Sequence, residues 1–574
     1  MKKDLAGEGA YPRQFVPPEA NPGKWSDLEP LFVALGSREI GSLPDLEQWV
    51  VDLGEVAACI DEEGARRYIA MTCHTGDPMA EQDYLQFVEK IEPQCKPWWQ
   101  RLYRKYVDHP MRGHLRSERY SVLDRTFENQ VRLFREENIA LEVEEAKLSQ
   151  LYQKLVGAMT GQFEGREQTL QELSRYLERP DRGLRQEAWQ IIAARRLKDR
   201  TEIEEIFDKL VDLRGRIARN AGFENYRDYA FLRRERFDYS PSDCFDFHRT
   251  IETVIVPAAR MIQEERRNRL GLKRLRPWDL SVDPEGRPPL QPFSSTEELI
   301  DGCHRIFCHM DATLGEYFGL LREKGLLDLM SRKGKAPGGY QSTLSERRLA
   351  FIFMNAVGID RDVRTLLHES GHAFHTLECR DEPLFFYRES PTEFCEVASM
   401  TMELLGARFL DVFYEGEEQN RSYRNLLEEI IVLFPWIATI DGFQHWIYTH
   451  EGHSRDQREQ VWLDLQKRFG GDEDWRGYED SLSTLWQKQL HLFLHPFYYI
   501  EYGIAQLGAL QLWRSARRDL PQTLAAYRWS LSLGGSRPLP QLFEAGGIRF
   551  DFTPKTTEAL MAEVVEEWRS MRCS

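Results

Sequence analysis

The sequence lacks several features that would mark particular classes of protein. It contains no run of about 18 consecutive apolar residues, the length a membrane-spanning helix needs, so we expect no membrane association. It has no excess of positive charge, since 76 Lys and Arg stand against 93 Asp and Glu and leave a net charge of −17. A general nucleic-acid binder usually presents a basic face, so nucleic acid is not an expected partner.

Cysteine is sparse as well, with nine residues scattered over 574 positions in no dense spacing pattern. In a long chain this usage is typical of reduced thiols and argues against a disulfide framework. The first residues include two lysines but no apolar stretch, which argues against a secretory signal. We therefore expect a cytoplasmic protein.

Helical patterns fill most of the chain. Residues 136–159, for example, carry apolar side chains at three- and four-residue intervals between strong helix formers. A chain of this length exceeds one compact core, and we predict a helical N-terminal lobe over residues 1–200 and a second lobe over residues 201–574 that holds the functional site. The short aromatic segment 348–357 (RLAFIFMNAV) predicts a β-strand, although a buried helical segment is the alternative.

Residues 365–378 (TLLHESGHAFHTLE) contain the clearest chemical pattern. We predict a helix here that begins near residue 361, with Asp360 as its N-cap. Side chains four apart share a helix face, so His368 and His372 can offer two nitrogens to one metal ion. Glu369 lies about 100° further round the helix, where it can hold a water as a general base. This is the H-E-x-x-H arrangement of zinc proteases, although the pattern also arises by chance.

A catalytic zinc needs a third protein ligand and an open position for water. Three glutamates follow the histidine segment. Glu389 precedes the next predicted helix, and Glu393 is expected to form a capping box with Ser390. Glu396 lies one turn further on, so the residues favour it without excluding the other two. Glu403, two turns on, can hydrogen-bond a ligand histidine or simply face solvent.

These residues resemble the M3 family of zinc metallopeptidases, the group of thimet oligopeptidase and oligoendopeptidase F. The resemblance rests on HESGHAFH from His368 and on EVAS at 396–399, and it extends to residues 227–248, 334–340, 350–355 and 496–513. It implies that Glu396 is the third zinc ligand, with one Zn²⁺ per chain. It also implies a mostly α-helical fold, a two-lobed ellipsoid with a deep central channel and a small β-sheet beside the zinc site.

A tyrosine-rich segment, HLFLHPFYYIEYG at 491–503, forms a second chemical cluster. Phenol hydroxyls can stabilise the oxyanion that forms when a peptide bond is attacked. The resemblance assigns this role to Tyr498 and Tyr502, which share a helix face, and to Tyr499 less directly; core packing is the alternative for each. One histidine before the tyrosines is expected to contact substrate, and we favour His491 over His495.

The channel implied by the family would admit short peptides. A peptide could add as a strand to the sheet beside the site, and residues 348–355 are the predicted edge, with the glycine-rich loop over the substrate. The residues expected to contact substrate are Gly338, Gly339, Tyr340, Phe351, Phe353 and Tyr499.

Together these features predict a zinc metalloendopeptidase that hydrolyses internal bonds of short unstructured peptides. Glu369 would be the general base for a metal-activated water, and His491, Tyr498 and Tyr502 would assist. The alternatives are a helical zinc carboxypeptidase and a non-catalytic peptide-binding protein. We expect a monomer or a weak homo-oligomer.

Overall fold

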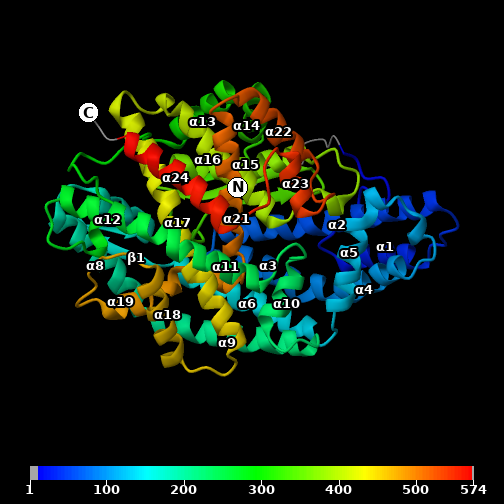
Figure 1. Cartoon of the computed structure of the whole chain (residues 1–574). Coiled ribbons are helices and arrows are strands. Elements are labelled where there is room, and N and C mark those ends of the chain that lie inside the picture. Colours follow the sequence, from blue (N-terminus) through cyan, green and yellow to red (C-terminus); the bar gives the residue numbers. More distant parts are fainter. Residues whose placement is uncertain (1–10, 572–574) are drawn as a thin grey trace.

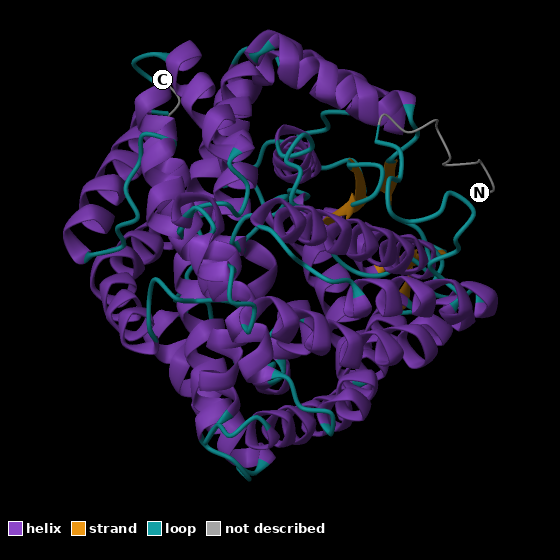
Figure 2. Ribbon diagram, turned by 90° about the vertical axis from the view of Figure 1, so that its right-hand side faces the viewer, coloured by secondary structure: helices purple, strands orange, loops and turns teal. Residues whose placement is uncertain are grey.

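The computed structural model describes residues 11–571, and helices account for most of that length (Figures 1 and 2). The mostly helical class predicted from the sequence is confirmed. The blue and cyan helices α1, α4 and α5 lie at one end of the molecule and α12 lies at the other (Figure 1). The lysines at residues 2 and 3 and Cys573 lie outside the described residues.

The helices of the first half are α1 (Trp25–Ser37), α2 (Leu43–Cys73), α3 (Pro78–Gln86), α4 (Glu92–Val107), α5 (Ser117–Leu133), α6 (Asn138–Gly157), α7 (Leu170–Ser174), α8 (Arg182–Lys198), α9 (Arg200–Asn220), α10 (Tyr226–Arg233), α11 (Pro241–Thr250) and α12 (Val256–Arg269). Those of the second half are α13 (Thr296–Met310), α14 (Ala312–Glu323), α15 (Asp360–Glu378), α16 (Thr392–Gly406), α17 (Glu417–Thr449), α18 (Arg455–Phe469), α19 (Glu479–Ser483), α20 (Leu490–Leu494), α21 (Tyr499–Ala516), α22 (Leu520–Ser532), α23 (Leu539–Ala545) and α24 (Pro554–Ser570).

Buried apolar side chains form two cores. The smaller core gathers residues between Val16 and Phe127, together with Leu384 and Tyr387. The larger core runs from Cys73 to Trp568 and surrounds the histidine helix α15. A chain of this length is expected to divide its apolar side chains in this way, and the boundary at residue 200 stays a prediction.

The predicted strand at 348–357 is confirmed as β5 (Leu349–Ala356), which packs on α15. It is the central strand of a three-stranded sheet in the order β3-β5-β4, in which β3 (Leu327–Met330) is parallel and β4 (Tyr340–Leu344) antiparallel to it. The prediction that residues 348–355 form the edge is therefore wrong. The run is apolar because a central strand is covered on both faces, and β4 is an edge instead. A separate hairpin pairs β1 (Thr160–Phe163) with β2 (Arg166–Thr169).

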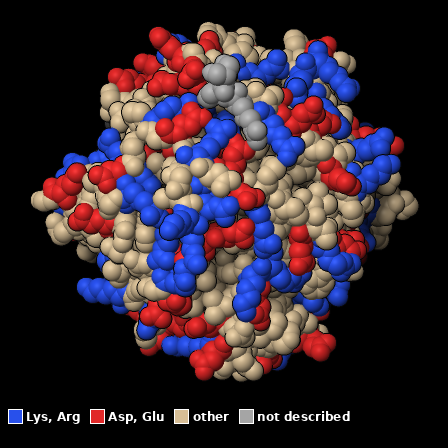
Figure 3. Space-filling view, turned by 60° about the vertical axis from the view of Figure 1, so that its left-hand side comes forward, with Lys and Arg blue, Asp and Glu red and all other residues tan. Residues whose placement is uncertain are grey.

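Acidic and basic side chains alternate over the face shown in Figure 3, so the net negative charge is not gathered there in one patch. None of the helices within residues 11–571 combines the length and the apolar character needed to cross a membrane. The cysteines described are all free thiols, as the sparse spacing predicted.

Candidate active site

The start of α15 differs in detail from the sequence prediction. The carboxylate of Asp362 accepts the backbone N–H groups of Val357, Gly358 and Ile359 at 2.7–3.0 Å. Asp360, the predicted cap, instead accepts the hydroxyl of Tyr414 at 2.7 Å and pairs with Arg364. Asp362 thus does the capping, because Asp360 is committed to partners brought in from other parts of the fold.

The predicted metal ligands converge between α15 and α16. Nε2 of His368 lies 3.3 Å, and Nε2 of His372 lies 3.4 Å, from Oε2 of Glu396. The three ligand atoms all lie within 4.8 Å of one another. Two imidazole nitrogens and one carboxylate oxygen are the protein donor set of a catalytic zinc. The side chains present therefore fit a zinc ion.

Glu396 is 1% exposed. Burial alone would raise the pKa of its carboxyl, but the imidazoles of His372 and His368 outweigh burial and hold that pKa well below its usual range. The side chain is therefore a carboxylate, the form in which it can bind a metal ion.

A glycine allows the two ligand-bearing helices to approach closely. A Cβ at Gly371 would lie 2.5 Å from Cα of Ser399 and 2.6 Å from the carbonyl oxygen of Ala398. Both contacts are shorter than real Cβ atoms make. The absence of a side chain at Gly371 thus brings α16, and with it Glu396, up to the histidines of α15.

The capping box predicted at the start of α16 is wrong. The hydroxyl of Ser390 instead lies 2.9 Å from Nε2 of His375, and Glu393 accepts the hydroxyl of Tyr239 at 2.6 Å. No side chain caps this helix. Both residues still have structural partners, and neither belongs to the cluster of candidate ligands found among residues 11–571. The exposed Glu389 does not belong to it either.

Further contacts orient the candidate ligands. Nδ1 of His368 lies 2.7 Å from Oε1 of Glu403, which leaves Nε2 for a metal ion. The Glu396 carboxylate accepts the hydroxyl of Ser399 at 2.8 Å and also that of Tyr498. Of the two roles open to Glu403 in the sequence, the structure favours the contact with His368, a candidate ligand.

Glu369 lies on the same helix and is 6% exposed. Burial raises the pKa of its carboxyl above the usual range. The position that a Cβ would take at Gly339 is 3.2 Å from Oε1 of Glu369, so the glycine-rich loop passes directly over this carboxyl. Gly338 has a φ of +91°, which favours glycine at that point of the loop.

Tyr502 lies at the end of a chain of hydrogen bonds. The indole N–H of Trp436 donates to Oε1 of Gln489 at 2.9 Å. This contact sets the amide, so that Nε2 of Gln489 donates to Nδ1 of His491 at 2.8 Å. The proton of His491 is then on Nε2, which lies 3.1 Å from the hydroxyl oxygen of Tyr502. The hydroxyl of Tyr502 accepts from the histidine and keeps its own proton for another acceptor.

Electrostatics agree with this assignment. Burial lowers the pKa of His491 to about 4, so its imidazole is neutral at pH 7. Burial, together with the negative charges of Glu396 and Glu369, raises the pKa of Tyr502 well above its usual range. Tyr502 is therefore a protonated donor. His495, the alternative to His491, is exposed.

The remaining predicted contact residues lie around the sheet. The ring of Tyr340 stacks on Phe353 at 4.7 Å between centroids, and its hydroxyl lies 2.6 Å from that of Thr72. Phe353 is fully buried and Phe351 is 9% exposed. Tyr499 is 8% exposed and packs against His491 with 5.1 Å between centroids.

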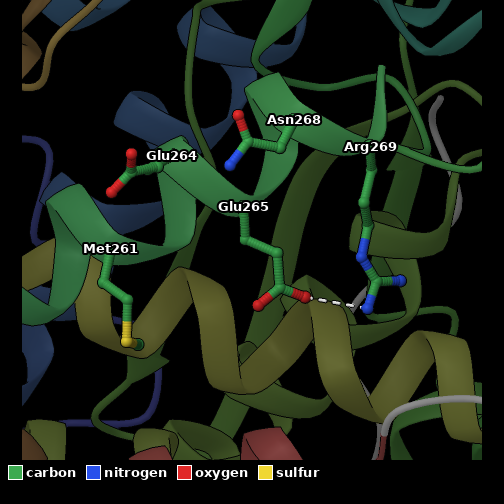
Figure 4. A pocket seen from close by; sticks show the side chains of 5 residues that line it. All are labelled: Met261, Glu264, Glu265, Asn268 and Arg269. Carbon is green, nitrogen blue, oxygen red and sulfur yellow. Dashed lines mark ion pairs between the residues drawn. The ribbon is translucent and has the colours of Figure 1, made fainter. Parts of the chain in front are cut away.

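Two hollows differ in their distance from this site. One, of about 420 Å³, is lined by α2, α4, α6, α10 and His495. It adjoins the tyrosines, because Arg234 on its wall donates to the carbonyl of Pro496 at 2.7 Å and covers the ring of Tyr498. The other, of about 460 Å³, lies on α12 alone, where Glu265 is paired with Arg269 at 2.9 Å (Figure 4).

The sequence analysis did not predict roles for three residues: Trp436, Gln489 and Gly371. Gln489 lies two residues before His491, and this short spacing was the only available signal. Trp436 lies 53 positions from Gln489, so their contact depends on the tertiary fold. Gly371 is visible within the motif, but only the crossing of α15 and α16 reveals its effect.

Comparison with known proteins supports the family suggested by the motifs. Residues 175–562 match peptidase family M3. An oligoendopeptidase F homologue from Borreliella burgdorferi is 27% identical over 273 residues, which cover 45% of this chain and 44% of that protein. Oligopeptidase PepF from Bacillus subtilis is 28% identical over 245 residues, which cover 41% and 36% of the two chains. Each match thus spans less than half of the relative.

Solved structures match over nearly the whole chain. PZ peptidase A with an inhibitor superposes with a TM-score of 0.92 at 26% identity, covering 97% of this chain and 99% of that one. An oligoendopeptidase F structure gives a TM-score of 0.91 at 28% identity, with the same coverage. The fold, the family match and the clustered ligands agree with one another. The chain therefore belongs to peptidase family M3.

Proposed function

We propose that this protein is a zinc-dependent endopeptidase that hydrolyses internal bonds of short, unstructured peptides. The observation that carries the proposal is the convergence of His368, His372 and Glu396 beside Glu369, with a phenol donor on the facing segment. A zinc ion held by the three ligands would polarise the scissile carbonyl and activate a water molecule. The family membership and the relatives named as oligoendopeptidases support the same activity.

Glu369 is the general base. It follows His368 on α15 and is buried beneath the glycine-rich loop, where its carboxylate can take a proton from the attacking water. The same group then passes the proton to the leaving amide nitrogen. Its raised pKa favours this second role, because a weakly acidic carboxyl holds a proton more readily than an exposed glutamate does.

The two tyrosines have different tasks. Tyr502 donates its free hydroxyl proton to the oxyanion that develops on the former carbonyl oxygen. His491 positions Tyr502 by occupying one lone pair of its oxygen. Tyr498 donates to Glu396 and so holds a zinc ligand in place.

Substrate binds along β4. This strand pairs with β5 on one side, and on the other side no backbone hydrogen bond to another segment is found within residues 11–571. A peptide that adds there is held by its main chain, largely independent of its sequence. Asn355 donates to the carbonyls of Ala336 at 2.9 Å and Gly338 at 2.8 Å, which fixes the loop between this edge and Glu369. Tyr340, Phe351 and Tyr499 form the surrounding wall, and the fully buried Phe353 supports the ring of Tyr340 from behind.

The test is mass spectrometry of a pool of short peptides, each present with a free and with an amidated C-terminus. The zinc-loaded protein should cut internal bonds in both forms, and Glu369→Gln should lose the cuts while retaining zinc. Stepwise loss of C-terminal residues from the free acids alone would establish a carboxypeptidase instead. Binding of intact peptides without any cut would establish a binding protein. The cytoplasmic location and the monomeric or weakly associating state stay predictions.

A further inference from the structure

Outside the active site, two helices present metal-binding side chains to each other. Cys244 and His248 lie four residues apart on α11, and Asp441 and His445 lie four apart on α17. Side chains at this spacing share a helix face, and the two helices pack together. The thiol of Cys244, a carboxylate oxygen of Asp441 and a ring nitrogen of His445 lie within 4.8 Å of one another. Nε2 of His248 lies 2.9 Å from Oδ2 of Asp441.

The cluster is buried yet incompletely satisfied. Cys244, Asp441 and His445 are all at most 2% exposed. Oδ1 of Asp441 and both ring nitrogens of His445 have no hydrogen-bond partner among the residues that the structure describes. Nε2 of His445 does lie 3.2 Å from Oδ2 of Asp441, but not in line for a hydrogen bond. Buried polar atoms normally have partners, so orphaned atoms gathered in one buried cluster indicate a missing ligand.

The charges of the cluster suit a divalent cation. Within residues 11–571, the only ion pairs of Asp441 are with the two histidines, and no lysine or arginine pairs with it. A neutral imidazole such as that of His445 can donate the lone pair of a ring nitrogen to a metal ion. A bound metal ion would displace the proton of the Cys244 thiol. One thiolate and one carboxylate would balance the two positive charges of the ion. The buried guanidinium of Arg236 also acts electrostatically on Cys244, and Glu501 pairs with that guanidinium at 2.8 Å.

Aromatic rings enclose His445. The ring centroids of Phe245, Phe497 and Phe231 lie 4.7, 5.3 and 5.9 Å from that of the imidazole. Such an apolar shell excludes solvent and resembles the surroundings of a structural metal site more than those of a catalytic one, which keeps a position open for water.

We propose that Cys244, His248, Asp441 and His445 bind a second, structural zinc ion that joins α11 to α17. Four protein ligands complete a tetrahedral shell, in which ligand atoms about 3.3 to 3.8 Å apart would surround the ion. Thiolate and imidazole ligands favour zinc over magnesium or calcium. His248 is not part of the cluster whose ligand atoms lie within 4.8 Å of one another, so its ring would have to move closer to Cys244 and His445 to complete the shell.

The second site would also support the tyrosine segment. Gln444, the neighbour of His445, accepts the backbone N–H of Phe497 at 2.5 Å. Phe497 has a φ of +65°, a conformation that is costly for this residue and needs support from its surroundings. Because Tyr498 follows directly, a zinc ion that fixes α17 also fixes the start of α21.

Cobalt substitution tests the proposal, because a thiolate bound to Co²⁺ gives a near-ultraviolet charge-transfer band that nitrogen and oxygen ligands do not give. The active-site ligands include no sulfur, so the band would report on Cys244 alone. The full-length protein, stripped of metal and reloaded with Co²⁺, should bind two ions per chain and show the band. His368→Ala/His372→Ala should retain one ion and the band.

Cys244→Ala should lose one ion and the band, whereas Cys303→Ala, which removes a fully buried thiol on α13, should lose neither. One ion per chain without the band in the unaltered protein would overturn the proposal. A band that survives in Cys244→Ala would overturn it as well. The measurement on the unaltered protein decides the question even if Cys244→Ala fails to fold.

Discussion

Nε2 of His491 lies 3.1 Å from the hydroxyl oxygen of Tyr502, and the hydrogen bonds behind it determine which atom carries the proton. Trp436 can only donate, so Gln489 must accept with its oxygen and donate with its nitrogen. The hydroxyl proton of Tyr502 is therefore not used by His491 and, in the proposed mechanism, is available to the substrate. In that mechanism His491 would control the proposed oxyanion donor through its tautomer, without being a metal ligand itself.

Gln489→Glu should reverse the direction of the hydrogen bond between His491 and Tyr502. A carboxylate accepts from both Trp436 and His491 Nδ1, so the histidine proton moves to Nδ1 and Nε2 becomes an acceptor for the Tyr502 hydroxyl. We expect kcat to fall about 10- to 100-fold, part of the effect of losing an oxyanion donor, with the affinity for zinc unchanged. Steady-state kinetics and a zinc titration measure both quantities. Unchanged kcat would show that the tautomer does not matter.

The two tyrosines should respond differently to removal of the hydroxyl. Tyr502→Phe removes the oxyanion donor, and kcat/KM should fall about 10²- to 10³-fold at any zinc concentration. Tyr498→Phe removes a donor to Glu396, so the affinity for zinc should fall about 10- to 100-fold and excess zinc should restore much of the activity. Activity measured against zinc concentration separates the two variants. If excess zinc restores Tyr502→Phe as well, the assignment is incorrect.

Local sequence patterns predicted those parts of the site that depend on one helix. The spacing of His368, Glu369 and His372 fixes their relative positions once the helix forms, and the apolar run at 348–357 fixes the strand. Glu396 needed two helices to come together, and the resemblance to the family singled it out. Its contact with both histidines agrees with that choice.

Other features depended on tertiary partners that no local pattern reveals. Asp360 and Ser390 both have the residue types of N-caps. In the fold, Tyr414 and Arg364 engage Asp360, and His375 lies against Ser390. The edge strand was misassigned for a similar reason, because an apolar run shows that a strand is buried but not which neighbours it has.

Acid should destabilise the protein partly through His375. Burial lowers the pKa of this histidine to about 3 in the folded state, whereas the unfolded chain has a value of about 6.5. Between these values the unfolded state binds more protons, so the free energy of unfolding must fall as the pH falls from about 6.5 towards 3. Above about 6.5 both states are neutral and the effect vanishes.

His375→Gln keeps a hydrogen-bonding group near Ser390 but removes the titration. Its free energy of unfolding should decline less steeply with falling pH, by up to about 1.4 kcal/mol per pH unit. Urea unfolding at pH 7, 5.5 and 4.5 measures the two slopes. A chelator in every sample keeps both proteins free of metal, so that the titration of His368 and His372 affects the two slopes equally. Parallel slopes would contradict the prediction.

Gly371→Ala should weaken zinc binding without touching any ligand. The new Cβ would lie 2.5 Å from Cα of Ser399, and neither helix backbone can yield without moving the whole helix. Overpacking of this kind costs about 1 to 3 kcal/mol, and the displacement of α16 carries Glu396 away from the histidines. We expect a lower free energy of unfolding and an affinity for zinc reduced about tenfold or more, since loss of a supporting contact alone has an effect of that size.

Gly215→Ala is the matched control. It introduces the same methyl group in the helix α9, where the nearest atoms are the flexible side-chain ends of Arg219 and Glu451 at 3.4 and 3.5 Å. Because alanine is the better helix former, this variant should be neutral or more stable by up to about 1 kcal/mol, with zinc affinity unchanged. Equal behaviour of the two variants would mean that the close crossing of α15 and α16 does not position Glu396.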